Sequence, residues 1–429
     1  MNSSSTTDIH YPVMIIGGGQ AGLSVSYYLK EMGLKHLILE KDSLVHGWKN
    51  ERWDSFTLVT PNWQCDLPGH PYDGDDPKGF MTQKETVAYL ERFVDKFKPP
   101  VQEGVTVTQV SSDASGLYHV ATSHGDFTAD QVVVASGGYR IPVIPRMAER
   151  IPHEIFQIHS AQYRNARQLP EGSVLVVGSG QSGAQIAEDL HLEDRSVYLA
   201  TGNAPRVSRR YRGRDVVEWL HDMGYYDISV EDHPLGKDVR SNTNHYVTGR
   251  DGGRDIDLRK FALEGMELFG SLTDYSGEDF IFEPNLRTNL DKADNTLNSI
   301  NARIDAWIDK QGIETEEGAS VYSPLWSPRQ EFTRLNPSEA GITSIVWCIG
   351  FRPDFGWLDA PVFNGRGHPQ HQRGVTGQPG LYFIGLPWLH TWGSGRFSGV
   401  KRDAEHLVEQ IAAYSKAPAP SYSEKATAS

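Results

Sequence analysis

Two glycine-rich segments of the chain have the residue types and the spacing that bind the pyrophosphate of a dinucleotide. Each has three glycines at GxGxxG spacing after a short apolar run. In this pattern the first glycine makes a tight turn, the second lets the pyrophosphate approach the backbone, and the third packs a helix against a strand. The glycines are Gly17, Gly19 and Gly22 in the first segment and Gly178, Gly180 and Gly183 in the second. The sequence therefore predicts two dinucleotide-binding sites.

The elements around the first turn favour a nucleotide-binding unit over a chance glycine loop. The apolar run 13–16 predicts a strand, residues 23–32 a helix and residues 36–39 a second strand. Glu40 follows that strand, where an acidic side chain can hydrogen-bond a ribose hydroxyl. The N-terminus of the helix presents unpaired N–H groups to the phosphates. This order of elements predicts an α/β fold of the Rossmann type.

The second turn has the same order of elements but lacks the acid. Strands are predicted over residues 174–177 and 196–200, and Thr201 stands where an acid would repel a 2′-phosphate. Several arginines follow, namely Arg206, Arg209, Arg210 and Arg212. Guanidinium groups match the charge and geometry of a phosphate, so NADPH is favoured over NADH, with Arg206 and Arg209 as candidate ligands. Alternatively, these arginines line a solvated loop or pair with Asp215 and Glu218.

Two further apolar phrases predict where the chain crosses between domains. Residues 131–145 and 344–358 each read as a strand that ends in small residues and then proline. The second nucleotide domain is therefore expected to be inserted into the first. The predicted parts are 1–145 and 342–415 for the first domain, 146–341 for the inserted domain, an aromatic and helical insertion at about 213–335, and a disordered tail at 416–429. That insertion is interpreted as a lid, a substrate pocket or additional core.

Composition narrows the class of partner. The chain has 429 residues, is 38 % hydrophobic and has a formal net charge of -14, which argues against nucleic acid. It has no apolar run long enough to span a bilayer and no signal-peptide pattern at its start, so we expect a cytoplasmic protein that does not bind membranes. Two cysteines, Cys65 and Cys348, give neither a CxxC redox pair nor a cysteine-based metal site. Small molecules are the expected partners, and a homo-oligomer is left open.

Several sequence segments together resemble those of one protein family. They are IIGGGQAG, VVGSGQSG, VVVASGGY, WCIGFRPD and the closing GLYFIGLPWLHTWGSGRFSGVKRDAEHLVEQI. The sequence resembles the class B flavin-dependent monooxygenases, which are flavoproteins with two dinucleotide-binding domains, including the YUCCA-like and Baeyer–Villiger branches. The phrases HGWKNERWDSFTLVTPNWQCDLPG and YVTGRDGGRDIDLRKFALEGM are more narrowly similar to bacterial flavin oxidoreductases encoded near nitrilases. The resemblance implies an FAD domain of the three-layer ββα type with an inserted NADPH domain.

The resemblance also implies which residues hold the cofactors. FAD is expected at Gly17, Gly19, Gln20, Ala21, Gly22, Glu40, Lys41 and Trp48. NADPH is expected at Gly178, Gly180, Gln181, Ser182 and Gly183, together with Arg206 and Arg209. The segment around Gly385 is expected to lie over the flavin.

In this family NADPH reduces FAD, and reduced FAD reacts with molecular oxygen to give a C4a-peroxide that oxygenates a small substrate at nitrogen, sulfur or a carbonyl group. Water must be excluded, and the tryptophan-rich segment 47–68 is the candidate wall. Within it Arg52, Asn62 and Gln64 are the candidate catalytic residues, because amides donate hydrogen bonds without a charge cost. The alternative is that the tryptophans pack in a core and the amides cap a loop.

One departure from the family pattern opens a second reading. Of the monooxygenase signature FxGxxxHxxx(Y/W), only His159 and Tyr163 fit, with His153 and Ile155 in the places of Phe and Gly. His159 is therefore interpreted as a structural hinge rather than a proton donor. The alternative function is an NAD(P)H-dependent flavin oxidase or dehydrogenase that inserts no oxygen.

Overall fold

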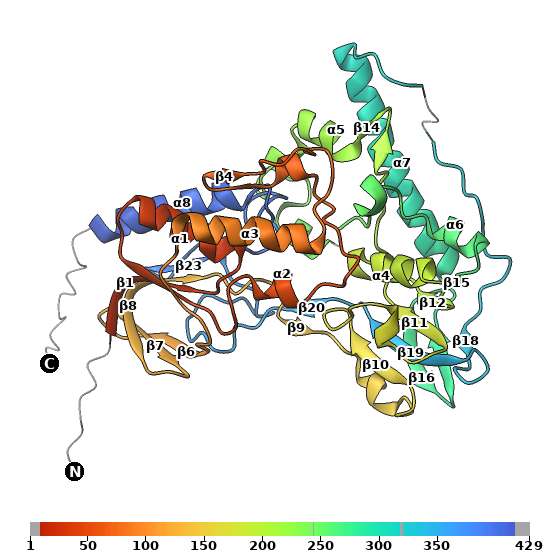
Figure 1. Cartoon of the computed structure of the whole chain (residues 1–429), viewed down its shortest axis with the longest axis horizontal. Helices are drawn as coiled ribbons and strands as arrows, with labels where there is room; N and C mark the ends of the chain where they lie inside the picture. Colours follow the sequence, from red (N-terminus) through yellow and green to blue (C-terminus); the bar gives the residue numbers. More distant parts are fainter. Residues whose placement is uncertain (1–8, 243, 318–320, 417–429) are drawn as a thin grey trace, which may run out of the picture.

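The computed structural model describes residues 9–242, 244–317 and 321–416. The chain forms two lobes, each built around a mainly parallel sheet (Figure 1). The predicted disordered tail 416–429 lies outside the described residues except for Lys416, which ends helix α8. In the part of the chain that is described, no helix is both long and apolar enough to cross a membrane.

The first lobe has three layers. Its central sheet has the strand order β21-β22-β23-β8-β1-β2-β5, with β1 parallel to both β2 and β8. Helices α1, α3 and α8 cover one face, and the ribbon of β6 and β7 covers the other (Figure 1). The strands are β1 (Ile9–Ile16), β2 (His36–Leu39), β5 (Val101–Gln102), β6 (Val107–Ser112), β7 (Tyr118–Thr122), β8 (Phe127–Val134), β21 (His371–Gln372), β22 (Val375–Thr376) and β23 (Leu381–Phe383). The helices are α1 (Gln20–Glu31), α2 (His46–Asn50), α3 (Gln83–Phe97) and α8 (Val400–Lys416), and a small hairpin pairs β3 (Asp66–Leu67) with β4 (His70–Pro71).

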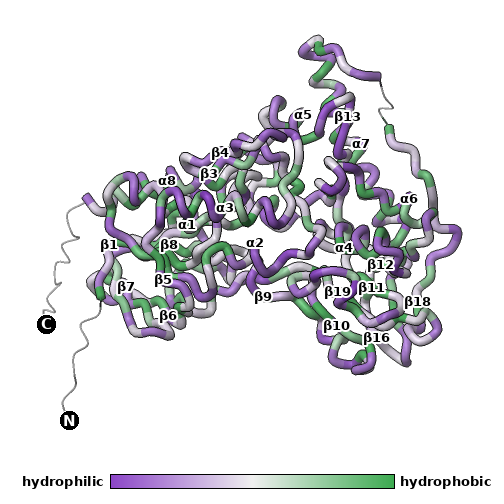
Figure 2. Tube along the Cα trace, in the orientation of Figure 1, coloured by the Kyte–Doolittle hydropathy of each residue, from purple (hydrophilic) through white to green (hydrophobic). Residues whose placement is uncertain are grey.

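Apolar residues on both faces of β1 explain why this strand is central. Val13 and Ile15 pack under the helices, whereas Met14 and Ile16 pack against the ribbon. A strand buried on both faces reads as a continuous apolar run, as expected in a parallel sheet. These strands form the hydrophobic centre of the lobe in Figure 2.

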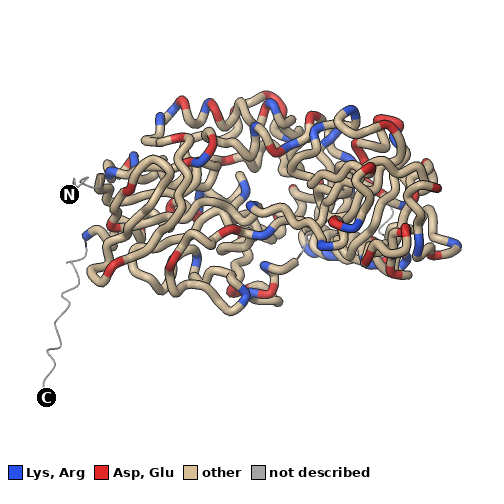
Figure 3. The backbone as a smooth tube through the Cα atoms, turned by 90° about the horizontal axis from the view of Figure 1, so that it is seen from below, with Lys and Arg blue, Asp and Glu red and all other residues tan. Residues whose placement is uncertain are grey.

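The second lobe is built on a five-stranded parallel sheet of order β10-β19-β11-β12-β15. The strands are β10 (Phe156–His159), β11 (Ser173–Val177), β12 (Val197–Ala200), β15 (Glu267–Phe269) and β19 (Ile342–Trp347), and β16 (Leu272–Ser276), β17 (Asp279–Phe282) and β18 (Arg334–Leu335) form a separate sheet. The helices are α4 (Gln181–Leu192), α5 (Val216–Asp222), α6 (Leu258–Leu263) and α7 (Leu286–Gln311), and β13 (Arg210–Tyr211) pairs with β14 (Arg214–Asp215). Acidic and basic residues are interspersed over both lobes (Figure 3).

The two chain crossings lie side by side. Strand β9 (Ile141–Pro142) pairs antiparallel with β20 (Phe351–Arg352) between the lobes. The predicted return to the first domain at residue 342 is wrong by one strand, because β19 (Ile342–Trp347) lies between β10 and β11 of the second sheet. An apolar run predicts a buried strand but not the sheet to which it belongs.

The region predicted as an insertion, about 213–335, is only partly separate. It contains α5, α6 and α7, as the helical signals indicated, but β15 completes the edge of the second sheet beside β12. Its α7 forms a long helix that extends away from that sheet (Figure 1).

Candidate cofactor and substrate sites

The first glycine turn has the geometry that its spacing predicts. Gly17 has a φ of +115°, and a Cβ there would lie 2.6 Å from the carbonyl oxygen of Ala135. A Cβ on Gly22 would lie 2.1 Å from the Gly17 oxygen, whereas Gly19 faces open space. Gly19 is the N-cap of α1, which has neither a side-chain cap nor an acid in its first turn. The helix N–H groups are thus left for a phosphate, and the turn fits a dinucleotide.

The predicted ribose acid lies beside this turn. One oxygen of Glu40 accepts a hydrogen bond from Gly18 N at 2.7 Å, and the other accepts one from Asp42 N at 2.9 Å. Both bonds fix the carboxylate at the carboxyl end of β2, where the ribose of a dinucleotide lies. Lys41 is exposed, with its Nζ 3.6 Å from a carboxylate oxygen of Asp42.

The closing segment of the chain is fastened to the first turn. Gln20 Nε2 donates to the carbonyl oxygen of Gly395 at 2.9 Å and its Oε1 accepts from Trp48 Nε1 at 3.0 Å. The Trp48 ring stacks on Phe397 with centroids 5.1 Å apart. Gly385, with a φ of +80°, would place a Cβ 2.9 Å from the Ala21 side chain. The structure thus brings Trp48 and Gly385, which are remote in sequence, against the adjacent residues Gln20 and Ala21.

The three predicted catalytic residues have different environments. Both polar atoms of the Asn62 amide hydrogen-bond the backbone of its own loop. Its Oδ1 accepts from Met81 N at 2.8 Å, and its Nδ2 donates to the carbonyl oxygen of Asp76 at 2.9 Å. Asn62 therefore fits the loop-capping alternative. In contrast, Gln64 is buried and its Oε1 has no hydrogen-bond partner in the described structure.

Arg52 lies with its guanidinium 4.8 Å from the centre of the Trp48 ring. Burial lowers the pKa of Arg52, and one of its nitrogens donates to the carbonyl oxygen of Glu51 at 2.8 Å. Arg52 thus places a positive charge beside the tryptophan that contacts the first turn.

The second glycine turn repeats the first. Gly178 has a φ of +101°, and a Cβ there would lie 2.6 Å from the carbonyl oxygen of Cys348. A Cβ on Gly183 would lie 1.8 Å from the Gly178 oxygen. Gly180 is the N-cap of α4, again without a side-chain cap or an acid in the first turn. The first two helical residues are Gln181, which donates to the carbonyl oxygen of Val247 at 2.6 Å, and the half-buried Ser182.

The structure contradicts the prediction that Arg206 binds a phosphate. Arg206 is only 3 % exposed, and its guanidinium lies 2.8 Å from Asp294 and 3.4 Å from Asp257. The face of its guanidinium lies 4.0 Å from the centre of the Tyr322 ring. These contacts hold the side chain inside the lobe, because the charge of a buried arginine must be paired.

The prediction that Arg209 binds a phosphate is also wrong. The alternative, that it pairs with Asp215, is what the structure shows. Arg209 is 1 % exposed, donates to Asp215 at 2.5 Å and to the carbonyl oxygen of Val59 at 2.9 Å. Sequence spacing identified the arginine cluster but not which side of the loop it faces.

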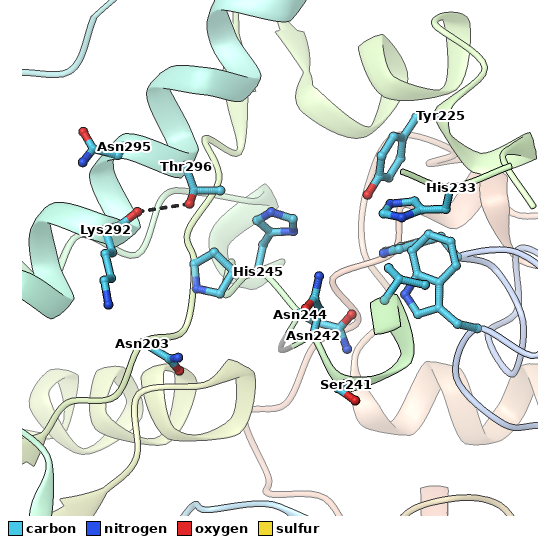
Figure 4. Close-up of a pocket in the computed structure, with 14 residues that line it drawn as sticks. Asn203, Tyr225, His233, Ser241, Asn242, Asn244, His245, Lys292, Asn295 and Thr296 are labelled. Atoms are coloured by element: carbon cyan, nitrogen blue, oxygen red, sulfur yellow. Dashed lines mark hydrogen bonds between the residues drawn. The ribbon is translucent and has the colours of Figure 1, made fainter. Parts of the chain in front are cut away.

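A pocket of about 530 Å³ lies between α7 and residues 225–242 (Figure 4). Lys292, Asn295 and Thr296 line it from α7, and Tyr225 and His233 lie on the opposite side. A smaller cavity of about 360 Å³ shares several of these residues and adds Ser299, Ile300 and Arg303 of α7. Sequence reasoning did not predict the α7 residues of this pocket, whose one signal is a polar stripe at helical spacing. It also missed His233 and His245, which carry no such signal.

The two residues that fit the monooxygenase signature have structural contacts. His159 Nε2 lies 3.1 Å from the Gly350 oxygen, and its Nδ1 accepts from Ala161 N at 3.2 Å. The hydroxyl of Tyr163 donates to Asp189 at 2.7 Å. Backbone partners occupy both ring nitrogens of His159, beside the crossing strand β20, which agrees with the hinge interpretation.

Neither cysteine is poised for redox chemistry. Cys65 and Cys348 are free, buried and part of different hydrophobic clusters. Burial raises the pKa of Cys65 to about 12 and also raises that of Cys348, so neither thiol ionises readily. Within the ranges that the structure describes, no group of three or more His, Cys, Asp or Glu side chains could hold a metal ion.

These two lobes, each with a strained glycine turn, define a protein of the two-dinucleotide-domain oxidoreductase class. The model of the pyridine nucleotide-disulphide oxidoreductase family matches residues 14–232. The chain belongs to this family. It is 33 % identical over 402 residues to an uncharacterized CzcO-like oxidoreductase of Geobacillus kaustophilus (strain HTA426), covering 93 % of this chain and 97 % of that protein.

Two further comparisons relate the chain to monooxygenases. It is 30 % identical over 211 residues to the probable indole-3-pyruvate monooxygenase YUCCA4 of Arabidopsis thaliana, covering 48 % of this chain and 51 % of that protein. Its fold is similar to the flavin-containing monooxygenase from Stenotrophomonas maltophilia, with a TM-score of 0.63, 20 % identity and coverage of 95 % and 99 % of the two chains.

These findings confirm the predicted class and fold, a flavin-dependent oxidoreductase of the monooxygenase type with two Rossmann-like lobes. The family description agrees with the predicted nicotinamide cofactor. A protein of similar fold, the ornithine N-hydroxylase of Kutzneria sp. 744, has a solved structure described with reduced FAD and NADP⁺, at a TM-score of 0.62 and 17 % identity. The narrower resemblance to oxidoreductases encoded near nitrilases stays a prediction.

Proposed function

We propose that the protein is an NADPH-dependent FAD monooxygenase that transfers one atom of molecular oxygen to a small substrate at nitrogen, sulfur or a carbonyl group. The observation that carries this proposal is the pair of uncapped helix N-termini, at Gly19 and Gly180, one in each lobe. Two dinucleotides, one per lobe, are what hydride transfer from NADPH to a flavin requires.

Bound FAD would accept the hydride of NADPH and activate oxygen. The residues of the chain would bind and orient the cofactors and exclude water from them. The turn at Gly17 and Gly19 would hold the FAD pyrophosphate, and Glu40, fixed by its bond from Gly18 N, would accept a hydrogen bond from the ribose. Trp48 and Phe397 stack into an apolar wall beside this turn, which would limit the access of water to a flavin bound there. Of the two predicted amides, Gln64 is the one with a buried atom that lacks a partner in the described structure, and this oxygen would accept a hydrogen bond rather than donate one.

The 2′-phosphate of NADPH needs a cation other than Arg206 or Arg209. Lys292 is exposed on α7 and lines the pocket together with Asn203, which lies just beyond the carboxyl end of β12. In a Rossmann unit the end of this second strand faces the adenosine ribose. We therefore assign the phosphate contact to Lys292 and Asn203.

This assignment is tested by replacing Lys292 with glutamine. A charge-assisted contact contributes about 1.5–3 kcal/mol, so its loss at an exposed site should raise the KM for NADPH roughly tenfold. The KM for NADH should stay within about twofold, since NADH lacks the phosphate. Lys310→Gln removes the same charge from the last turn of the same helix and is the matched control. An equal rise in both KM values in the Lys292 variant would refute the assignment.

The broken signature around His159 favours a second candidate, an NADPH oxidase that releases all the oxygen as hydrogen peroxide. Stopped-flow spectroscopy separates the two functions. The flavin-loaded protein is reduced with NADPH without oxygen and then mixed with aerated buffer. A transient absorbance before the oxidised flavin spectrum returns, with peroxide release below the NADPH consumed when a substrate is present, supports the monooxygenase. Single-step reoxidation with stoichiometric peroxide in every case supports the oxidase.

A further inference from the structure

The pocket beside α7 has an unusual charge for this protein. The chain has 55 acidic and 41 lysine and arginine residues. Yet among the described residues that line the two adjoining cavities there is no aspartate or glutamate. The ionisable residues that line them are His233, His245, Lys292, Arg303 and Tyr225. A cavity with this lining has a positive potential, which attracts an anion.

Two guanidinium groups act on the same corner of the pocket. Burial is the main cause that lowers the pKa of His245, to about 4, and the charges of Arg303 and Arg396 lower it further. Burial raises the pKa of Tyr225, and the same two arginines oppose that rise. His245 is therefore neutral at pH 7, so the arginines carry the positive charge of this corner.

Neither of these arginines is neutralised by a carboxylate in the part of the chain that the structure describes. Arg396 donates to Asn244 at 2.8 Å and to the carbonyl oxygen of Trp392, and its guanidinium lies 4.0 Å from the centre of the Trp392 ring. Arg303 is exposed on the pocket face of α7. By contrast, Arg206, Arg209 and Arg259 of the same lobe are all paired with aspartates. An unpaired arginine fork in a pocket suits a carboxylate, which it can bind through two hydrogen bonds.

Aromatic rings form the opposite wall. Trp388 and Trp392 come from the closing segment and Tyr225 from the loop after α5. Trp388 has a φ of 50°, which is rare for a bulky side chain, and Arg240 holds its carbonyl oxygen at 3.0 Å. The structure thus maintains a strained tryptophan against the cavity. Such rings bind a planar or apolar group through their faces.

The same closing segment contacts the first glycine turn through Gly395 and Gln20. A ligand in the pocket is therefore held by the segment that is also fastened to the expected flavin site. This placement favours a substrate over an unrelated ligand. The residues of the second glycine turn do not line the pocket, although Lys292 and Asn203, to which we assign the NADPH phosphate, line one end of it.

We propose that this pocket binds the substrate as a small organic carboxylate, with Arg303 holding the carboxylate and the tryptophans holding its aromatic or apolar part. The inference rests on the proposed function, because it makes the ligand the substrate of that reaction. Lys292, at the other end of the pocket, lies eleven residues before Arg303, or about 16 Å along the helix at about 1.5 Å per residue. Because of this separation, Lys292 can contact the NADPH phosphate while Arg303 contacts the substrate carboxylate.

Binding of phenylacetate and phenylacetamide tests the proposal, because the two probes have the same ring but differ in charge. Isothermal titration calorimetry measures each Kd on the flavin-loaded protein with oxidised flavin and no NADPH. Phenylacetate should bind at least about tenfold more tightly than the amide. Arg303→Gln should remove that preference, Arg303→Lys should retain part of it, and Lys310→Gln should leave it within about twofold.

Three outcomes would overturn the proposal. The amide could bind as tightly as the carboxylate, or neither could bind at all. Arg303→Gln could keep the preference for the carboxylate. Arg303→Gln could also weaken NADP⁺ as much as phenylacetate, which would make the pocket part of the cofactor site. Because this assay needs neither flavin reduction nor oxygen, its result is independent of the stopped-flow test of the proposed function.

Discussion

Replacing Arg206 with alanine should destabilise the second lobe and leave cofactor preference unchanged. Arg206 is 3 % exposed, and its partners Asp294 and Asp257 have side chains only 9 % and 14 % exposed. Removing the guanidinium leaves Asp294 with Arg259 as its remaining cation, at 2.8 Å. It leaves Asp257 without a cation, although Asp257 still accepts hydrogen bonds from the Tyr322 hydroxyl at 2.8 Å and from Arg259 N at 2.9 Å. Breaking a buried ion pair from one side costs about 3–5 kcal/mol, because the other charge stays buried.

The assay is thermal unfolding followed by circular dichroism. At about 2–4 °C per kcal/mol for a domain of 150–250 residues, the transition of this lobe should move down by roughly 6–20 °C. Arg210→Ala is the matched control, since Arg210 is exposed and its one hydrogen bond joins it to the Gly252 oxygen at 3.3 Å. That control should change stability by no more than about 0.5 kcal/mol. An unchanged transition for Arg206→Ala, together with a KM that rises for NADPH but not for NADH, would refute the reasoning and restore the phosphate role.

Further predictions concern the glycine turn, the thiols and the pH dependence of stability. Gly17→Val should yield a colourless protein, because a Cβ there would lie 2.6 Å from a backbone oxygen, and normal flavin absorbance in this variant would contradict that. Cys65→Ala should keep NADPH consumption within about twofold, since burial holds the pKa of this thiol at about 12; complete loss of turnover in a folded variant would implicate thiol chemistry. Burial raises the pKa of Asp403 from 3.8 to about 6, so the native state holds its proton more tightly than the unfolded state. Its stabilisation is therefore fully present below about pH 4 and is lost as the pH rises to about 6, by the order of 3 kcal/mol at about 1.36 kcal/mol per pKa unit. Urea unfolding of wild type and Asp403→Asn at both pH values should show this loss only in the wild type.

The fold was predictable because its signals are local. A strand, a strained turn and a helix lie within one short stretch at each fingerprint, and Gly17 and Gly178 need the positive φ that their spacing predicts. The class of the protein followed from these two stretches together with the other segments that resemble the family, among them VVVASGGY and WCIGFRPD. The domain boundary was missed because β19 (Ile342–Trp347) reads as an apolar run whichever sheet takes it, and only its pairing with β10 and β11 decides.

The phosphate ligands were mispredicted because charge alone says nothing about burial. Arg206 and Arg209 have the residue type that a phosphate needs, but their aspartate partners are Asp294, Asp257 and Asp215, two of which lie far along the chain. Asn62 and Gln64 show the same limit over a shorter distance. They are two residues apart, yet the amide of Asn62 hydrogen-bonds the loop backbone through both of its polar atoms, whereas the oxygen of Gln64 has no partner in the described structure.

The substrate pocket could not be predicted because the closing segment joins parts of the chain that are remote in sequence. Gly395 accepts a hydrogen bond from Gln20 of the first turn, whereas the adjacent Arg396 donates to Asn244 beside the pocket. In the same segment the carbonyl oxygen of His390 accepts from Val230 N at 2.7 Å. Adjacent residues of this closing segment thus contact the expected flavin site and the pocket.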